Sequence, residues 1–161
     1  MTFQEAVEAA PMPVCESYRP GKQALKAGHR EQVTCSDPRC FTGSVDLDGA
    51  LRDTVEHRQA NRWDYGIGFR DEDEKEVAIW VEVHPASAGE VKTVIEKYRW
   101  LLTWLRVEAP ALGSLSKRSG GSKIFFWLAT EPGVNIRRGS LQARRLQSAG
   151  LDLPRYRLQL K

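Results

Sequence analysis

Two stretches of alternating side chains, residues 63–70 and 76–84, constrain the fold of this chain more than any other feature. In the second stretch, apolar residues alternate with a set that ends in Glu82 and His84, so a strand places these two side chains on one face. In the first stretch, Asp64 shares its face with two glycines, which leaves room in front of the carboxylate. If the two strands are neighbours, Asp64, Glu82 and His84 converge on a space that one metal ion would fill.

The patterns around this strand pair predict an α/β sandwich, in which a mixed β-sheet is flanked by helices. Apolar spacing and capping residues predict helices over residues 2–10, 22–27, 50–59 (with Asp48 as N-cap), 88–107 and 140–149. Alternation and turn residues predict further strands over residues 31–35, 43–47, 123–129 and 155–160. Breaks are predicted at Pro85, at Pro132-Gly133 and in a flexible basic loop over residues 113–122.

Length and composition favour a single domain, because 161 residues with 41% hydrophobic content suffice for one core. We divide the chain into an N-terminal extension (1–45), a core (46–130) and a basic C-terminal helix with an edge strand (131–161). No run approaches the roughly 18 apolar residues of a membrane span. Acidic residues near the N-terminus also argue against a secretory signal. We therefore expect a cytoplasmic protein without a membrane partner.

The three cysteines leave two interpretations open. Cys35 and Cys40 are close in the sequence, and together with Cys15 and His29 they would supply four zinc ligands. There is no second close Cys/His pair, so small buried or half-buried thiols are the preferred interpretation. An odd number of cysteines argues against a disulfide framework.

Charge is distributed unevenly along the chain. Acids outnumber bases between residues 46 and 82, and bases outnumber acids from residue 112 onward. This asymmetry suits a cation site beside a polyanion-binding surface, although solvated faces of an ordinary basic protein would give the same pattern. The candidate nucleic-acid contacts are Lys117, Arg118, Lys123, Arg137, Arg138, Arg144 and Arg145.

The long helix over residues 88–107 is apolar on two sides. One stripe faces the sheet, and Trp100 and Trp104 lie on the other side, one turn apart. We expect the chain's own N-terminal segment to cover this pair of tryptophans. The alternatives are a second copy in a homodimer, another protein partner or a ligand.

The order of helix, strand pair, helix and strand, together with the acidic residues, resembles the PD-(D/E)XK nuclease superfamily. In that family an acid at the start of one strand and an acidic-x-Lys triplet on the next strand hold a divalent cation. An acid on the preceding helix often assists. The resemblance covers roughly residues 48–129 and implies a restriction-endonuclease-like core. It implies Mg²⁺ or Mn²⁺ held by Asp64, Glu82 and a helix acid, which is Glu56 or Asp53.

The resemblance is incomplete at the lysine of the motif, where this sequence has His84. A neutral imidazole is able to take a proton from an attacking water, so His84 fits the chemistry. Alternatively, Lys92 or Lys97 on the next helix sends an ammonium group back to the site. Loss of catalysis is the third possibility.

The resemblance implies a metal-dependent nuclease that hydrolyses phosphodiester bonds in DNA or RNA, with Asp64, Glu82 and His84 at the reacting centre. The alternative is a catalytically inactive nuclease-fold module that binds nucleic acid or a protein partner. A purely structural role stays open as well, in which Asp64 and Glu82 pair with Arg62 or Arg70.

Overall fold

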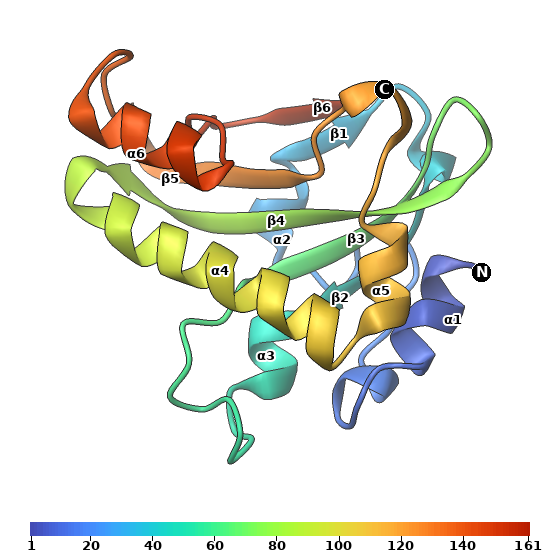
Figure 1. Ribbon diagram of the computed structural model, residues 1–161. Coiled ribbons are helices and arrows are strands. Elements are labelled where there is room, and N and C mark those ends of the chain that lie inside the picture. The colour runs from blue at the N-terminus through green and yellow to red at the C-terminus, as the bar shows by residue number, and fades with distance from the viewer.

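The computed structural model describes residues 1–161, apart from the side chain of Pro132. A mixed four-stranded sheet in the order β2-β3-β4-β5 forms its centre (Figure 1). Its strands are β2 (Phe41–Asp46), β3 (Tyr65–Arg70), β4 (Glu76–Ser87) and β5 (Phe125–Asn135). The first three are antiparallel neighbours, and β5 runs parallel to β4. The expected mixed α/β architecture is confirmed.

A second, two-stranded sheet lies above the first in Figure 1. It pairs β1 (Val33–Cys35) with β6 (Leu158–Leu160) in parallel. The buried side chain of Gln32 joins the two parts, because its amide donates hydrogen bonds to the carbonyls of Ala129 (2.7 Å) and Tyr156 (2.8 Å). The predicted C-terminal edge strand therefore exists, but it pairs with the N-terminal part of the chain.

Helices complete the fold around the sheets. They are α1 (Phe3–Glu8), α2 (Ala27–Arg30), α3 (Leu47–Leu51), α4 (Val91–Val107), α5 (Pro110–Leu115) and α6 (Leu141–Ala149). The structure also contains four single 3-10 turns, which are η1 (Val14–Glu16), η2 (Pro38–Cys40), η3 (Ala88–Glu90) and η4 (Ser119–Gly121). Parallel strands need a crossover connection, and α4 and α5 supply it between β4 and β5. Among the residues described, no helix is both long and apolar enough to cross a membrane.

The helix ends confirm several capping predictions. Thr2 and Glu5 form the predicted capping box of α1. The Ser140 hydroxyl accepts a hydrogen bond from the Ala143 amide at the start of α6, and Gly150 ends that helix in a left-handed conformation. The sheet-facing stripe of α4 is buried as expected, except that Leu102 is exposed.

The predicted helix over residues 50–59 is wrong in both its start and its length. The N-cap is Asp46, whose carboxylate accepts a hydrogen bond from the Gly49 amide, and α3 ends at Leu51. The Arg62 guanidinium donates hydrogen bonds to the carbonyls of His57 (2.8 Å) and Arg58 (3.0 Å). These carbonyls are satisfied by a side chain from outside the segment, so the backbone folds as turns.

Two predicted breaks are also wrong. Strand β4 continues past Pro85 to Ser87, with a register shift between His84 and Ala86 that accommodates the missing amide. Strand β5 continues through residues 132–133 to Asn135, with Gly133 at a φ of +109°. The parallel ladder between β4 and β5 is thus longer than the alternation alone predicts.

Two further segments differ from expectation. Residues 22–25 form turns and helix α2 begins only at Ala27, so Gly28 lies inside a helix and does not cap one. The start of the predicted flexible loop 113–122 belongs to α5. A Cβ at Gly113 would lie 2.9 Å from the Leu105 carbonyl oxygen, so this glycine allows α5 to pack closely against α4.

Candidate functional site

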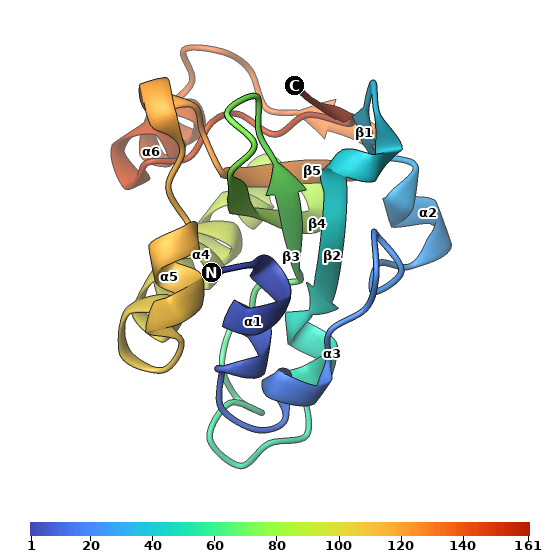
Figure 2. The same ribbon diagram turned by 90° about the vertical axis from the view of Figure 1, so that its right-hand side faces the viewer.

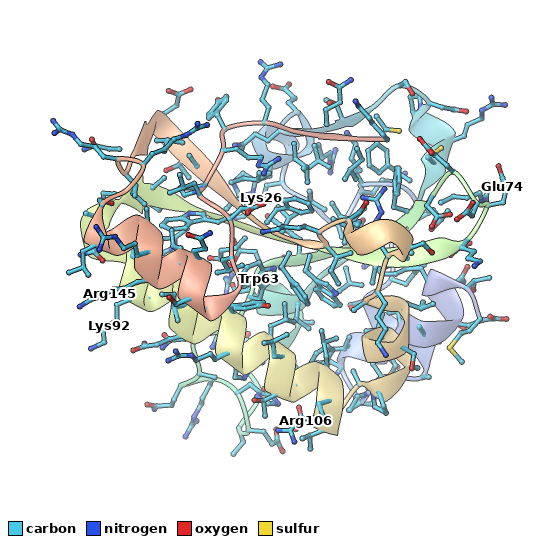
Figure 3. All side chains as sticks on the ribbon, turned by 45° about the horizontal axis from the view of Figure 1, so that its top comes forward. Lys26, Trp63, Glu74, Lys92, Arg106 and Arg145 are labelled. Carbon is cyan, nitrogen blue, oxygen red and sulfur yellow. The ribbon has the colours of Figure 1, made fainter. Side chains whose placement is uncertain are left out.

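The start of β3 and the middle of β4 bring Asp64 and Glu82 together. The Asp64 backbone amide donates a hydrogen bond to Oε1 of Glu82 (3.0 Å), and the Val83 amide donates one to Oδ2 of Asp64 (3.0 Å). The Glu82 carboxylate therefore binds the backbone of Asp64, and the Asp64 carboxylate binds the backbone of the residue after Glu82. Trp63, near the centre of Figure 3, packs on Tyr98 of α4 with ring centroids 6.2 Å apart.

Lys97 of α4 completes the contacts of Glu82. Its ammonium donates a hydrogen bond to Oε2 of Glu82 at 2.5 Å. The Glu82 side chain is 0% exposed and that of Lys97 is 16% exposed, so this ion pair lies inside the protein. A buried carboxylate requires such a partner, because removing a charge from water is costly.

The sequence offered Lys97 only as an alternative to His84, together with Lys92. The usable signal was its spacing, since Lys97 is three residues after Val94 and four before Leu101, both buried. The long alkyl stem of lysine spans the remaining distance to the sheet.

His84 lies between two carboxylates. Its Nε2 is 2.7 Å from Oε2 of Glu90, and its Nδ1 is 3.6 Å from Oε2 of Glu82. The interaction with the Glu82 carboxylate, followed by the hydrogen bond with Glu90, raises the pKa of His84 above its ordinary value, although burial acts in the opposite direction. Glu90 comes from η3, and nothing in the sequence pattern linked it to the site.

The electrostatics of the cluster favour additional positive charge. Burial, followed by repulsion from Glu82, raises the pKa of Asp64 to about 7, although Lys97 and the Val83 amide act in the opposite direction. Burial lowers the pKa of Lys97, but attraction to Glu82 and Asp64 outweighs it and leaves the pKa raised. Near neutral pH, Lys97 is therefore charged and Asp64 is partly protonated.

The residues fit a hard divalent cation in one respect and oppose it in another. Two carboxylates supply the oxygen ligands that Mg²⁺ and Mn²⁺ prefer. A nearby cation would also stabilise the ionised form of Asp64, whose pKa is raised by burial and by Glu82. However, the ammonium of Lys97 already contacts Glu82, so a metal would compete with it. Within the described part of the chain, no three His, Cys, Asp or Glu side chains are arranged to hold a metal.

The space in front of Asp64 differs from the expectation. A Cβ at Gly66 would lie 2.7 Å from the Trp80 ring, and one at Gly68 would lie 2.5 Å from the Phe3 ring. The two glycines thus make room for aromatic side chains of the core. Access to the cluster is on the side of His84, which is 20% exposed, and Glu90, which is 38% exposed.

The candidate helix acids, Asp53 and Glu56, are both exposed and lie in the chain after the end of α3. Glu56 is exposed in the turns after α3 and lines a cavity of about 260 Å³ with His57 and Trp104. The acid of α3 whose charge acts on the site is Asp48, which raises the pKa of both Asp64 and Lys97.

The arginines proposed as structural partners bind other acids. Arg62 pairs with Asp48 at 2.9 Å, and Arg70 lies 3.8 Å from Glu74. Asp64 and Glu82 are therefore held by backbone amides and Lys97.

The predicted phosphate contacts fall into separate places. Lys123 and Arg138 line one large cavity, and Lys117, Arg118 and Lys123 line an adjoining one. Arg144 and Arg145 instead line a groove of about 490 Å³ between α4 and α6. The seven bases are thus not a single surface. Arg137 is exposed between β5 and α6.

The zinc alternative is not assembled among the residues that the structure describes. The three cysteines are free and half-buried. Cys15 contacts the sulfur of Met12 at 3.1 Å, and Nδ1 of His29 is 2.8 Å from the Tyr65 hydroxyl. Two of the four proposed ligands therefore have other partners.

Trp104 is buried, and the chain's own N-terminal segment, including Met12 and Val14, lines the cavity beside it. The two tryptophan rings stack with centroids 6.1 Å apart. Trp100 is only half-buried and makes an edge contact with the ring of His57. The preferred expectation, burial of this face by the chain's own N-terminus, is confirmed for Trp104.

Comparison of the chain with family models, with curated proteins and with solved structures yields no match.

Proposed function

We propose that this protein is a nuclease-like enzyme that hydrolyses phosphodiester bonds with the help of Mg²⁺ or Mn²⁺. The observation that carries the proposal is the meeting of Asp64, Glu82 and Lys97 where β3, β4 and α4 come together. The resemblance to PD-(D/E)XK nucleases implies two acids and a lysine on a strand pair, and here the lysine would come from the following helix instead of the strand.

The topology supports the same proposal. Strands β2, β3 and β4 form an antiparallel meander, α4 follows, and β5 pairs in parallel with β4. This order is compatible with the restriction-endonuclease-like core that the resemblance implies, with Asp64 immediately before β3 and Glu82 on β4, the two central strands. The side chain that fills the place of the missing motif lysine would be Lys97, which reaches the site from α4.

Each residue of the candidate site would have a separate role in hydrolysis. Asp64 and Glu82 would hold the cation, which when bound polarises the phosphate and activates a water. Lys97 would orient the water or stabilise negative charge on the phosphate. Because its pKa is raised, His84 fits the role of a cation or proton donor better than that of a proton acceptor.

The direct test incubates the purified protein with labelled single-stranded and duplex DNA and RNA, in Mn²⁺ or in EDTA. We expect product only with metal, and a loss of at least about a hundredfold in Asp64→Asn, Glu82→Gln and Lys97→Ala. Asp53→Asn, an exposed acid of the same charge, is the matched control and should cut like the wild type. Cutting that persists in Glu82→Gln would refute the assignment.

A second candidate function rests on the hydrogen bonds of the Glu82 carboxylate. Both of its oxygens already have partners inside the protein, which is the arrangement of a structural ion pair. An inactive nuclease-fold module would then bind nucleic acid or a protein without cutting. Nucleic-acid binding that persists in Asp64→Asn and Glu82→Gln, with no product under any metal condition, would favour this module.

A further inference from the structure

Helices α5 and α6 lie on the same side of the molecule, at the left of Figure 2. Three cavities that share lining residues adjoin one another along α5, residues 116–124 and α6. The first, of about 320 Å³, lies between α4 and α5. It shares Lys117 and Phe125 with a second cavity of about 320 Å³. The second shares Lys123 with a third of about 710 Å³ beside α6. We call these three cavities together the basic track.

The charges that line the basic track are mostly positive. Its bases are Arg106, Lys117, Arg118, Lys123, Arg138, Arg155 and Arg157. Among the described residues that line it, the single acid is Asp152, which binds Lys123 at 2.5 Å and Arg155 at 3.5 Å. A row of cations with so little compensation favours a ligand that carries repeated negative charge.

Apolar side chains line the same cavities as these cations. Leu105 and Pro110 line the first cavity, Phe125 joins the first to the second, and Leu153 and Pro154 line the third. A duplex keeps its base faces stacked inside, whereas a single strand exposes them for packing on apolar and aromatic groups. Each cavity also lies within or near the usual range of about 300–1,000 Å³ for ligand sites.

We propose that the basic track binds single-stranded nucleic acid, with backbone phosphates on the cations and bases in the three cavities. This proposal rests on the nucleic-acid function proposed above, and it names the strand form and the surface. The track is distinct from the groove between α4 and α6, where Lys92 and Arg145 project side by side (Figure 3). Arg106, which lines the track, lies at the far end of α4 in the same view.

The test measures fluorescence anisotropy of a labelled oligothymidylate with the full-length protein in EDTA, so that no cutting intervenes. The track variant is Lys117→Ala/Arg138→Ala/Arg157→Ala. The matched control, Lys92→Ala/Arg144→Ala/Arg145→Ala, removes the same charge from the α4–α6 groove, because the proposal assigns binding to the basic track and no longer to Arg144 and Arg145. All six side chains are exposed, so both proteins should fold, which circular dichroism checks.

We expect the track variant to bind the oligothymidylate at least about tenfold more weakly than the wild type. The slope of log K against log salt concentration should decrease in magnitude by about 2, because three phosphate contacts are lost. The control should stay within about twofold of the wild type, and a duplex should bind more weakly than the single strand. Equal losses in both variants, tighter duplex binding, or equal binding of polyglutamate would overturn the proposal. Because the assay contains no metal, a failed cleavage test leaves its outcome unchanged.

Discussion

The ammonium of Lys97 lies 2.5 Å from Oε2 of the fully buried Glu82 and ties helix α4 to strand β4. This ion pair stands beside Asp64, whose amide binds the other oxygen of the same carboxylate. A single buried acid on β4 therefore joins helix α4 to the start of β3. The partners of Glu82 therefore affect both the stability of the fold and the charge of the candidate site.

Removing one partner of this pair should destabilise the protein strongly. Lys97→Met leaves the Glu82 charge buried without compensation, which costs about 3–5 kcal/mol in comparable cases. Urea unfolding of Lys97→Met, Glu82→Gln and the double variant measures the coupling as a double-mutant cycle. Lys92→Met, an exposed lysine of the same helix, should change the unfolding free energy by less than about 0.5 kcal/mol. Additive losses in the cycle would show that the pair does not interact.

The stability of the fold should depend on the ionisation of Asp64. The pKa of its carboxyl is raised to about 7 in the folded protein, so folding favours the protonated acid. The wild type should therefore lose stability relative to Asp64→Asn as the pH rises from about 4 through about 7. The raised pKa of His84 acts in the same direction in both proteins, so the difference between them isolates Asp64. Parallel curves of unfolding free energy against pH would contradict this assignment.

Divalent cations should act on the same carboxyl group. Mn²⁺ binds the ionised acid, so its stabilising effect should grow between pH 6 and 8 as Asp64 loses its proton. Thermal unfolding with and without Mn²⁺ measures this effect, and Asp64→Asn should remove most of it. Asp53→Asn should leave it intact, whereas an equal Mn²⁺ effect in Asp64→Asn and the wild type would place the cation elsewhere.

The glycines beside Asp64 should be intolerant of a methyl group. A Cβ at Gly66 would meet the Trp80 ring at 2.7 Å, and the ring is fully buried and held by a hydrogen bond from its Nε1 to the Ser116 hydroxyl. Gly66→Ala should cost about 1–3 kcal/mol of unfolding free energy by overpacking. Gly89→Ala, where a Cβ meets nothing within 4 Å, is the control. Chemical denaturation that shows both variants equally stable would contradict the packing described.

Much of the fold follows from local patterns in the sequence. The alternation of side-chain types located β3 and β4, although the structure buries both faces of these strands, and the apolar stripe located α4. The pattern failed after Leu51, because Arg62 binds the carbonyls of that segment from outside it. Such long-range hydrogen bonds leave no periodic signal.

The candidate site was predicted only in part for a similar reason. From the alternation we expected Asp64 and Glu82 to lie close together on paired strands, and the Asp64 amide does contact the Glu82 carboxylate. Lys97 was underrated and Glu90 was missed, because their roles depend on how far long side chains reach from a packed helix or turn. The open space expected beside Asp64 is occupied by Trp80 and Phe3, which come from other elements.

A crystal of the protein soaked in Mn²⁺ tests the central claim most directly. We expect an anomalous peak within coordination distance of carboxylate oxygens of both Asp64 and Glu82, with the Lys97 ammonium displaced from Oε2 of Glu82. No peak at this position, with Lys97 still bound to Glu82 at full Mn²⁺ concentration and pH 8, would contradict it.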